Sequence, residues 1–151
     1  MSKIICETPD QTFSLGEEIG RSLVAGDVVL LFGGLGAGKT LLTKGIMHGL
    51  GFDIDEVTSP SFTLVNLYKT SKVDVYHIDL WRLEASPDAA AAVGLDEILE
   101  NDNAVTIIEW AEHLGGFEFS RSVIKVELQG DGDEPREITI VGHNDQTIKG
   151  Q

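Results

Sequence analysis

The sequence predicts an α/β fold in which helices cover both faces of a mixed sheet. Two runs, Val28–Phe32 and Ala104–Ile108, are almost entirely apolar, which is typical of parallel strands that are buried on both faces. A shorter strand is expected at Lys3–Cys6. Segments with helical periodicity separate the strand patterns, and two later pairs of strand patterns have short connections that favour antiparallel pairing. We therefore expect three layers, with antiparallel strands added to a parallel core.

Two helices are expected in the first third of the chain. Either Asp10 or Thr12 is expected to cap the first helix, which should run to about Val24. The second helix should run from about Lys39 to Leu50. We expect Gly51 to be its C-cap residue, because glycine readily adopts the left-handed conformation that often ends a helix.

The middle of the chain is expected to form a hairpin followed by a helix. The strand patterns Thr63–Tyr68 and Val73–Leu80 are joined by four residues, which favours antiparallel pairing. A helical pattern covers Ser86–Glu100, with Ser86 and Pro87 as start signals and a break expected at Gly94.

The C-terminal part is expected to close the sheet. Val123–Leu128 and Glu137–Val141 alternate in polarity and should form an antiparallel pair. The polar residues 143–151 are expected to fray. We found no domain linker and no internal repeat, so residues 1–151 are expected to form a single domain.

The charge and cysteine content limit the possible functions. The net charge is −14, from 25 acidic and 11 basic residues, which argues against tight direct binding to tRNA or other nucleic acids and against anionic membranes. A basic protein partner remains compatible with this net charge.

The apolar runs are shorter than a membrane span of about 18 residues. Cys6 is the single cysteine and no signal-peptide pattern is present, so we expect a cytoplasmic protein.

The strongest motif is a glycine-rich loop between the expected strand and helix. Residues 33–40 read GGLGAGKT and match the pattern G-x-x-x-x-G-K-[ST] of phosphate-binding loops. Glycines let the backbone N–H groups curl around phosphate oxygens, and the following helix adds its positive N-terminal end. Lys39 would contact the β- and γ-phosphates, and the Thr40 hydroxyl would ligate Mg²⁺. The expected fold is therefore of the P-loop NTPase type.

Two strand ends supply carboxylates near this loop. Glu109 ends the apolar strand that begins at Ala104, and Asp79 ends the strand that begins at Val73. Ligands of doubly wound sheets bind beyond the carboxyl ends of parallel strands. Glu109 is therefore a candidate metal ligand, and Asp79 is a candidate for orienting the attacking water or holding a metal-bound water. The reverse division of roles is also open.

Two neighbouring residues have plainer interpretations. His77 alternates onto the same face as Val73 and Val75, which indicates a core histidine whose ring nitrogens are satisfied. Trp110 follows Glu109, and an aromatic residue there more often packs in the core than contacts a ligand.

The motifs favour ATP over GTP. Neither N-K-x-D nor D-x-x-G, which guanine-specific switches of the Ras type usually carry, occurs in the sequence. Small-molecule kinases share the phosphate loop but usually add lid arginines and a substrate domain. A small-molecule kinase and a nucleotide-gated binding module with incidental hydrolysis both remain alternatives.

The order of four motifs resembles one family. These are GGLGAGKT, VTSPSFTLVNLY, HIDLWRL and IIEW, and TFSLG at residues 12–16 also fits. The combination is similar to the bacterial TsaE family, the small ATPases of tRNA threonylcarbamoyladenosine biosynthesis, over about residues 10–114. The resemblance implies a P-loop protein that binds ATP and Mg²⁺ and hydrolyses ATP slowly alone. It also implies TsaD and TsaB as partners, a resetting role between turnovers, and tRNA contact through those partners.

The resemblance also implies roles for individual residues. Lys39, Asp79 and Glu109 would be catalytic, and Thr40 and Glu109 would hold the metal. Thr12 would lie near the nucleotide, and Trp110 matches a tryptophan that is implicated in the function of the family. The implied ATP-binding set is Thr12, Gly33, Gly34, Leu35, Gly36, Ala37, Gly38, Lys39, Thr40 and Leu41. The sequence departs from the family pattern at Gly34 (usually aspartate), Ser61 (usually threonine) and Trp81 (usually tyrosine).

The stretch VTSPSF at residues 57–62 is a candidate switch. It leaves the helix after the phosphate loop and leads into the strand expected to pair with the one ending at Asp79. In P-loop folds such a segment can reach the γ-phosphate side and respond to the nucleotide. We therefore expect Ser59 and Ser61, together with Trp110, to contact the nucleotide side or the partner.

Overall fold

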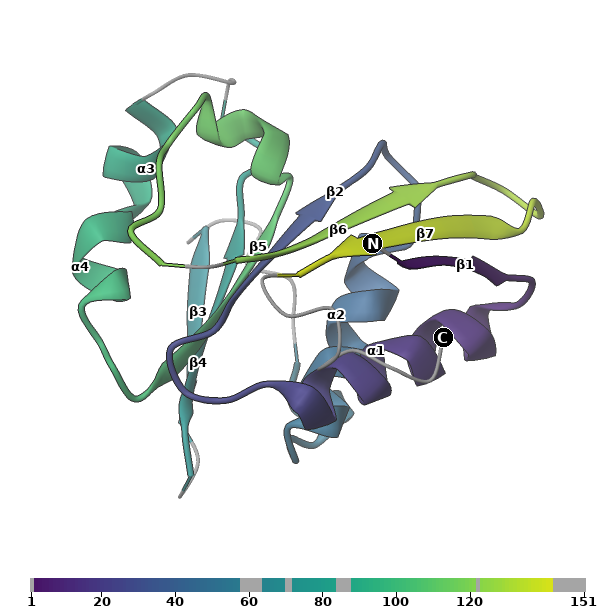
Figure 1. The fold of residues 1–151 in the computed structure, drawn as a ribbon, viewed down its shortest axis with the longest axis horizontal. Coiled ribbons are helices and arrows are strands. Elements are labelled where there is room, and N and C mark those ends of the chain that lie inside the picture. Colours follow the sequence, from purple (N-terminus) through teal and green to yellow (C-terminus); the bar gives the residue numbers. More distant parts are fainter. Residues whose placement is uncertain (1, 58–63, 70–71, 84–87, 122, 143–151) are drawn as a thin grey trace.

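The computed structural model describes residues 2–57, 64–69, 72–83, 88–121 and 123–142 (Figure 1). Within these residues a seven-stranded sheet has the order β1-β7-β6-β2-β5-β4-β3. Its strands are β1 (Ser2–Cys6), β2 (Val28–Phe32), β3 (Val65–Lys69), β4 (Asp74–Asp79), β5 (Ala104–Glu109), β6 (Ile124–Gln129) and β7 (Arg136–Val141). The helices are α1 (Pro9–Ser22), α2 (Lys39–Gly49), α3 (Asp88–Val93) and α4 (Leu95–Leu99), with 3-10 turns η1 (Ile54–Glu56) and η2 (Ala111–Leu114).

The sheet confirms the predicted mixed architecture. β6, β2, β5 and β4 are parallel neighbours, in that order. β3 pairs antiparallel with β4, and β7 pairs antiparallel with both β6 and β1. The two strands with the most apolar sequences, β2 and β5, lie side by side in the middle of the sheet. Their side chains are buried along almost their whole length, as expected for strands covered on both faces.

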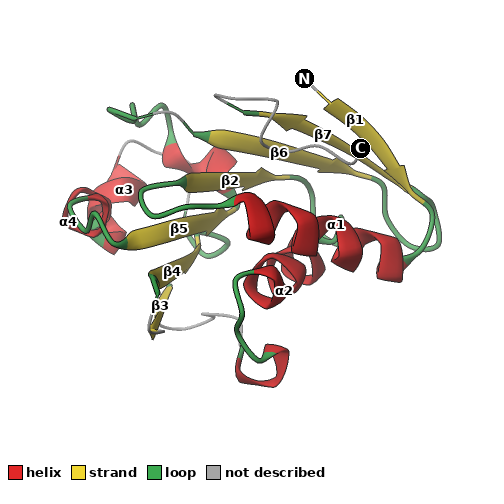
Figure 2. Cartoon of the chain, turned by 60° about the horizontal axis from the view of Figure 1, so that its bottom comes forward, coloured by secondary structure: helices red, strands yellow, loops and turns green. Residues whose placement is uncertain are grey.

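Helices form the two outer layers. α1 and α2 cover one face of the sheet, and α3, α4 and η2 lie against the other (Figures 1 and 2). Each face has its own apolar cluster, one that includes Ile19, Leu42 and Ile46, and one that includes Leu95 and Ile98. No helix among the described residues is long and apolar enough to cross a membrane.

α1 and α2 pack unusually closely because glycines line their contact. A Cβ atom on Gly45 of α2 would overlap the Phe13 carbonyl oxygen of α1, and one on Gly20 of α1 would overlap the Ile46 carbonyl oxygen of α2. Side chains larger than hydrogen are therefore excluded at these positions. The close contact fixes α2, and with it the loop that precedes α2, against the body of the protein.

The ends of the helices test three predictions. Neither Asp10 nor Thr12 caps α1. Thr8 is the N-cap residue, and its side chain accepts a hydrogen bond from Gln11 N at 3.2 Å. Gly51 directly follows Leu50, the C-cap residue of α2, and has the left-handed conformation that ends the helix (φ +96°). The break expected at Gly94 is present between α3 and α4, where Gly94 has φ +69°. Ser86, Pro87 and residues 143–151 lie outside the described residues.

Candidate functional site

The glycine-rich loop lies at the carboxyl end of β2 and leads directly into α2. Gly36 and Gly38 have φ angles of +80° and +103°, a conformation that glycine adopts without steric cost. The N–H groups of Gly36, Gly38, Lys39 and Thr40 have no hydrogen-bond acceptor among the described residues. These donors lie on the loop and in the first turn of α2, which is the arrangement that binds anions.

Lys39 lies inside the curve of this loop. Its side chain is almost fully buried, with 5% relative exposure of the residue. Nζ donates to the carbonyl oxygens of Gly33 and Gly34, at 2.6 and 2.8 Å, and lies 3.9 Å from the ring centroid of Trp110. Burial lowers the pKa of Lys39, while the charges of nearby carboxylates, Glu112 first, act in the opposite direction.

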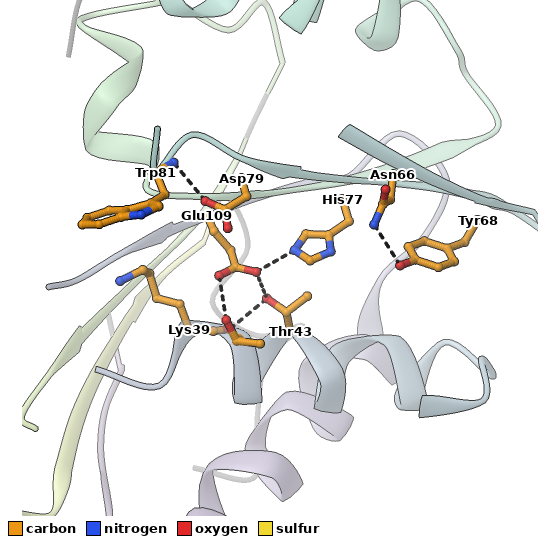
Figure 3. Close-up of polar contacts among 9 residues, drawn as sticks. Lys39, Thr43, Asn66, Tyr68, His77, Asp79, Trp81 and Glu109 are labelled. Carbon is orange, nitrogen blue, oxygen red and sulfur yellow. Dashed lines mark hydrogen bonds and ion pairs between the residues drawn. The ribbon is translucent and has the colours of Figure 1, made fainter. Parts of the chain in front are cut away.

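Glu109 ends β5 and is buried beside α2 (Figure 3). Its Oε2 is 2.6 Å from His77 Nε2 and 3.3 Å from the Thr43 hydroxyl. Its Oε1 is 3.4 Å from the Thr40 hydroxyl. Since an ionised carboxylate can only accept hydrogen bonds, His77 donates from Nε2. One carboxylate oxygen is thus held by His77, and the other faces Thr40.

The interpretation of His77 as a satisfied core histidine is only half right. The ring is buried and bonded to Glu109, but its Nδ1 has no hydrogen-bond partner within the described part of the chain. The bond to Glu109 connects β4 to β5, and the strand periodicity explains it. On β4, His77 and Asp79 lie on the same face of the sheet as Val75, and this face is turned toward α2. Glu109 lies on the same face at the end of β5.

Asp79 lies beside Glu109, because the two residues are paired in register at the ends of β4 and β5. Its Oδ1 accepts a hydrogen bond from Trp81 N at 2.9 Å (Figure 3). Burial raises the pKa of Asp79, and the charge of Glu109 raises it further. The Trp81 N–H group, His77 and Lys39 all lower it, but burial is the largest cause.

Aromatic side chains border the site. Trp110 adopts a left-handed conformation (φ +59°) that is uncommon outside glycine. Its ring lies 4.7 Å from that of Trp81 and 5.4 Å from that of His113, centroid to centroid. Trp81 is 49% exposed. Trp110 therefore packs against other rings, as the plainer interpretation expected, but it does so beside Lys39.

Two cavities meet at the loop. The larger, of about 480 Å³, is lined by residues 35–41, Lys44, Asp79, Trp81, Glu109 and Trp110. The smaller, of about 270 Å³, is lined by residues 6–9, Thr12, Gly38, Leu41, residues 132–134 and Arg136. Gly38 and Leu41 line both. Most of the predicted site residues are thus brought together, and Thr12 joins them from α1. Gly33 and Gly34 lie at the start of the loop, where their carbonyl oxygens bind Lys39, and they line neither cavity.

The oxygen atoms of Thr40 and Glu109 face each other at 3.4 Å and are of the kind that Mg²⁺ binds. Among the described residues there is no group of three or more His, Cys, Asp or Glu side chains that could hold a metal ion alone. Mg²⁺ does not need such a group, since it usually keeps several waters and binds one or two protein oxygens together with substrate phosphates. The residues present fit this pattern.

Several residues of the site were not predicted. Thr43 and His77 support Glu109, Lys44 lines the larger cavity, and Glu112 Oε2 accepts a hydrogen bond from Gly33 N at 3.1 Å. The helical period places Thr43 and Lys44 one turn after Lys39 and Thr40, on the same face of α2. Helical spacing in the sequence could therefore have predicted both residues. Ser59 and Ser61, the predicted switch residues, lie outside the described part of the chain.

The fold and the loop together define a P-loop-like α/β protein. A profile of the family described as "Threonylcarbamoyl adenosine biosynthesis protein TsaE" matches residues 6–138. The chain belongs to this family, which acts in tRNA threonylcarbamoyladenosine biosynthesis.

Named relatives and a solved structure agree with this assignment. The chain is 39% identical to tRNA threonylcarbamoyladenosine biosynthesis protein TsaE of Nostoc sp., over 76% of this chain and 70% of the relative. It is 36% identical to the protein of the same name from Treponema pallidum, over 91% and 98%. The crystal structure of Bacillus subtilis YdiB superimposes with a TM-score of 0.73 at 30% identity, covering 97% of this chain and 88% of that one.

Proposed function

We propose that this protein binds ATP with Mg²⁺ at the loop of residues 33–40 and hydrolyses it slowly when alone. In this proposal, ATP turnover acts on a complex of TsaB and TsaD between rounds of tRNA threonylcarbamoyladenosine formation. The family membership supplies the pathway. The site supplies the reason to expect a nucleotide.

One observation carries the proposal. N–H groups of the loop and of the first turn of α2, which have no acceptor in the part of the chain that the structure describes, share a cavity with Lys39, Thr40 and Glu109. A triphosphate needs backbone donors, a cation for its terminal phosphates and oxygen ligands for its Mg²⁺. The cavity offers all three at the carboxyl ends of parallel strands.

The smaller cavity is the natural place for the nucleoside. It continues from the loop past Gly38 and Leu41 and is walled by Thr12 and Arg136. A nucleotide whose phosphates occupy the loop can therefore extend its sugar and base into this space. Thr12 would then lie beside the nucleotide, as the resemblance implied.

The proposed chemistry follows from the positions of the charged groups. Lys39 would neutralise the phosphates, and Thr40 and Glu109 would hold Mg²⁺, which supplies further charge neutralisation when it is bound. Asp79 lies next to Glu109 and would orient the attacking water. Its raised pKa makes this carboxylate a better proton acceptor than an ordinary aspartate.

We propose that the site is incomplete for fast hydrolysis when the chain is alone. The described wall of the larger cavity contains two lysines and no arginine. A cation supplied by a partner accelerates phosphoryl transfer strongly in other P-loop proteins. We propose that the TsaB–TsaD complex completes this site, and the acidic charge of the chain fits a basic partner surface.

The test is an ATPase assay of the wild type and of Lys39→Ala, Asp79→Ala and Glu109→Ala, with and without TsaB–TsaD. Lys125→Ala is a matched control, because Lys125 is an exposed lysine on β6. We expect activation by the partners and loss of activity in the three site variants only. Wild-type rates for Asp79→Ala in the complex would remove Asp79 from the mechanism.

A second measurement separates the rival functions. The γ-phosphate of labelled ATP should appear as free phosphate, whereas its transfer to a metabolite would identify a kinase. Reconstituted tRNA modification over many turnovers should depend on hydrolysis. If a variant that binds ATP without cleaving it supports modification fully, the protein is a nucleotide-gated binding module.

A further inference from the structure

Arg136, the first residue of β7, reaches the phosphate loop from about a hundred residues further along the chain. Its Nε donates to the carbonyl oxygen of Ala37 at 3.2 Å, and its Nη2 donates to that of Gly36 at 3.2 Å. Both acceptors belong to the loop between β2 and α2. The guanidinium therefore binds the backbone of the loop, whereas Lys39 binds the carbonyl oxygens of Gly33 and Gly34.

The guanidinium is itself well anchored. It also donates to the carbonyl oxygens of Gly132 and Glu134, so it shapes the β6–β7 connection to which it belongs. The backbone of Arg136 is paired in register with Cys6 of β1. An arginine held by the sheet and by its own turn is a rigid support, since its planar fork of donors has little freedom left.

The bond to Ala37 has a consequence for the direction of the next N–H group. In a planar trans peptide the C=O of one residue and the N–H of the following residue point in opposite directions. With the Ala37 carbonyl held by Arg136, the N–H of Gly38 must point to the other side of the peptide. That N–H has no acceptor among the described residues, and Gly38 lines the larger cavity.

We propose that Arg136 is a positioning residue that orients the phosphate loop for anion binding. It holds the carbonyl groups of Gly36 and Ala37, so the loop presents its N–H groups to phosphate before any ligand arrives. This role rests on the proposed function, because it presumes that the loop binds phosphate. It differs from a direct contact with the nucleoside, which Arg136 could make only from the wall of the smaller cavity.

The test compares two ligands that differ in the nucleoside. Binding of Mg²⁺–pyrophosphate and of Mg²⁺–ADP is measured by calorimetry for the wild type, Arg136→Gln and Arg136→Lys. We expect both variants to bind both ligands about tenfold more weakly, since a loop that must be ordered on binding loses affinity. Lysine should not rescue binding, because an ammonium has three donors on one atom and cannot reach all four carbonyl groups that the Arg136 guanidinium spans.

Arg121→Gln is the matched control. Arg121 also donates to two backbone carbonyl groups, those of Gly26 and Leu99, at 3.0 and 2.6 Å, but it lies away from the loop. We expect Arg121→Gln to lower the melting temperature by an amount similar to that of Arg136→Gln while leaving both affinities unchanged. A merely structural role for Arg136 would make the two variants alike in binding as well.

Three results would overturn the assignment. Weaker ADP binding with unchanged pyrophosphate binding would show that Arg136 contacts the nucleoside. Full rescue by Arg136→Lys would show that positive charge is sufficient. Unchanged affinity for both ligands would remove any role in binding. If the wild type and Arg121→Gln bind neither ligand, the proposed function is wrong, and so is the role of Arg136 that depends on it.

Discussion

The two faces of the sheet are built from helices of different kinds. On one face, α1 has 14 residues and α2 has 11, and glycines bring them into close contact. On the other face, α3 has six residues and α4 has five, and they are separated by a left-handed glycine. The first face has long elements that cannot shift independently, so it can hold side chains in fixed positions.

The buried polar residues follow the same division. Among the described residues, six polar or charged residues are buried, and five of them are at or beside the candidate site on the α1–α2 side: Thr12, Lys39, Thr43, His77 and Glu109. The sixth is Thr106, which lies on the opposite face of β5 from its neighbours Val105 and Ile107. Burial of polar groups lowers stability. The tightly packed face therefore contains both the candidate site and most of the buried polar groups that destabilise the fold. Substitutions on the α1–α2 face should affect ligand binding as well as stability, and substitutions in α3 and α4 on the other face should affect stability alone.

The largest effect is expected from Gly45→Ala. The new methyl group would overlap the Phe13 carbonyl oxygen, so α1 and α2 must move apart. Overpacking against the backbone should lower the free energy of unfolding by about 3 kcal/mol. Binding of Mg²⁺–ADP should also weaken at temperatures where the protein is folded. Chemical denaturation and calorimetry measure the two effects, and unchanged stability would contradict the close helix contact.

His77→Phe should have the next largest effect. The change removes the donor to Glu109 Oε2. Among the described residues, this buried carboxylate then keeps only the longer contacts to Thr40 and Thr43. We expect a loss of about 2 kcal/mol in the free energy of unfolding, together with weaker dependence of nucleotide binding on Mg²⁺.

His113→Phe is the control for this substitution. His113 Nδ1 lies 2.8 Å from the Leu80 carbonyl oxygen, but His113 does not contact Glu109. It should cost some stability and leave the Mg²⁺ dependence unchanged. Equal Mg²⁺ dependence in the two variants would show that His77 does not position Glu109.

A smaller effect is expected from Gly94→Ala on the other face. Gly94 has φ +69°, and no described atom lies within 4 Å of the position that an added methyl group would occupy. The cost is therefore the left-handed backbone alone, about 1 kcal/mol. Affinity for Mg²⁺–ADP should not change. A loss of affinity comparable to that of Gly45→Ala would remove the distinction between the faces.

Asp79→Asn should have the smallest effect on stability, and the effect should be favourable. The folded state raises the pKa of Asp79, so folding favours the protonated form. Stability is therefore lost as the pH rises from the ordinary aspartate range through the raised pKa. Asparagine removes this loss and can still accept the bond from Trp81 N. The variant should melt higher than the wild type at neutral pH and should hydrolyse ATP about a hundredfold more slowly.

Melting curves between about pH 3 and about pH 8 test the sign of this effect. The difference between Asp79→Asn and the wild type should vanish below the ordinary pKa of aspartate. A variant less stable than the wild type at neutral pH would contradict the raised pKa.

Local patterns were sufficient to predict most elements. The apolar run Val28–Phe32 is β2 to the residue, and the helix expected from Lys39 ends one residue earlier than predicted. The cap of α1 was missed although a signal was present. Pro9 favours the first position of a helix, which points to Thr8 as the cap.

Contacts between distant segments were beyond prediction from the sequence. The bond between His77 and Glu109 joins residues 32 apart, and Arg136 reaches Gly36 across 100 residues. Both depend on the order of the strands, which no local pattern encodes. The predicted alternation did place His77 on the face of Val73 and Val75, but its partner on β5 became visible only with the pairing of β4 and β5.

Amide hydrogen exchange with and without Mg²⁺–ATP tests most directly whether the tightly packed face binds the ligand. The account predicts slower exchange at residues 36–40, in the first turn of α2 and at the end of β5, with no change in α3 and α4. Protection centred on α3 and α4, or binding detected by calorimetry with no protection of the loop, would contradict it.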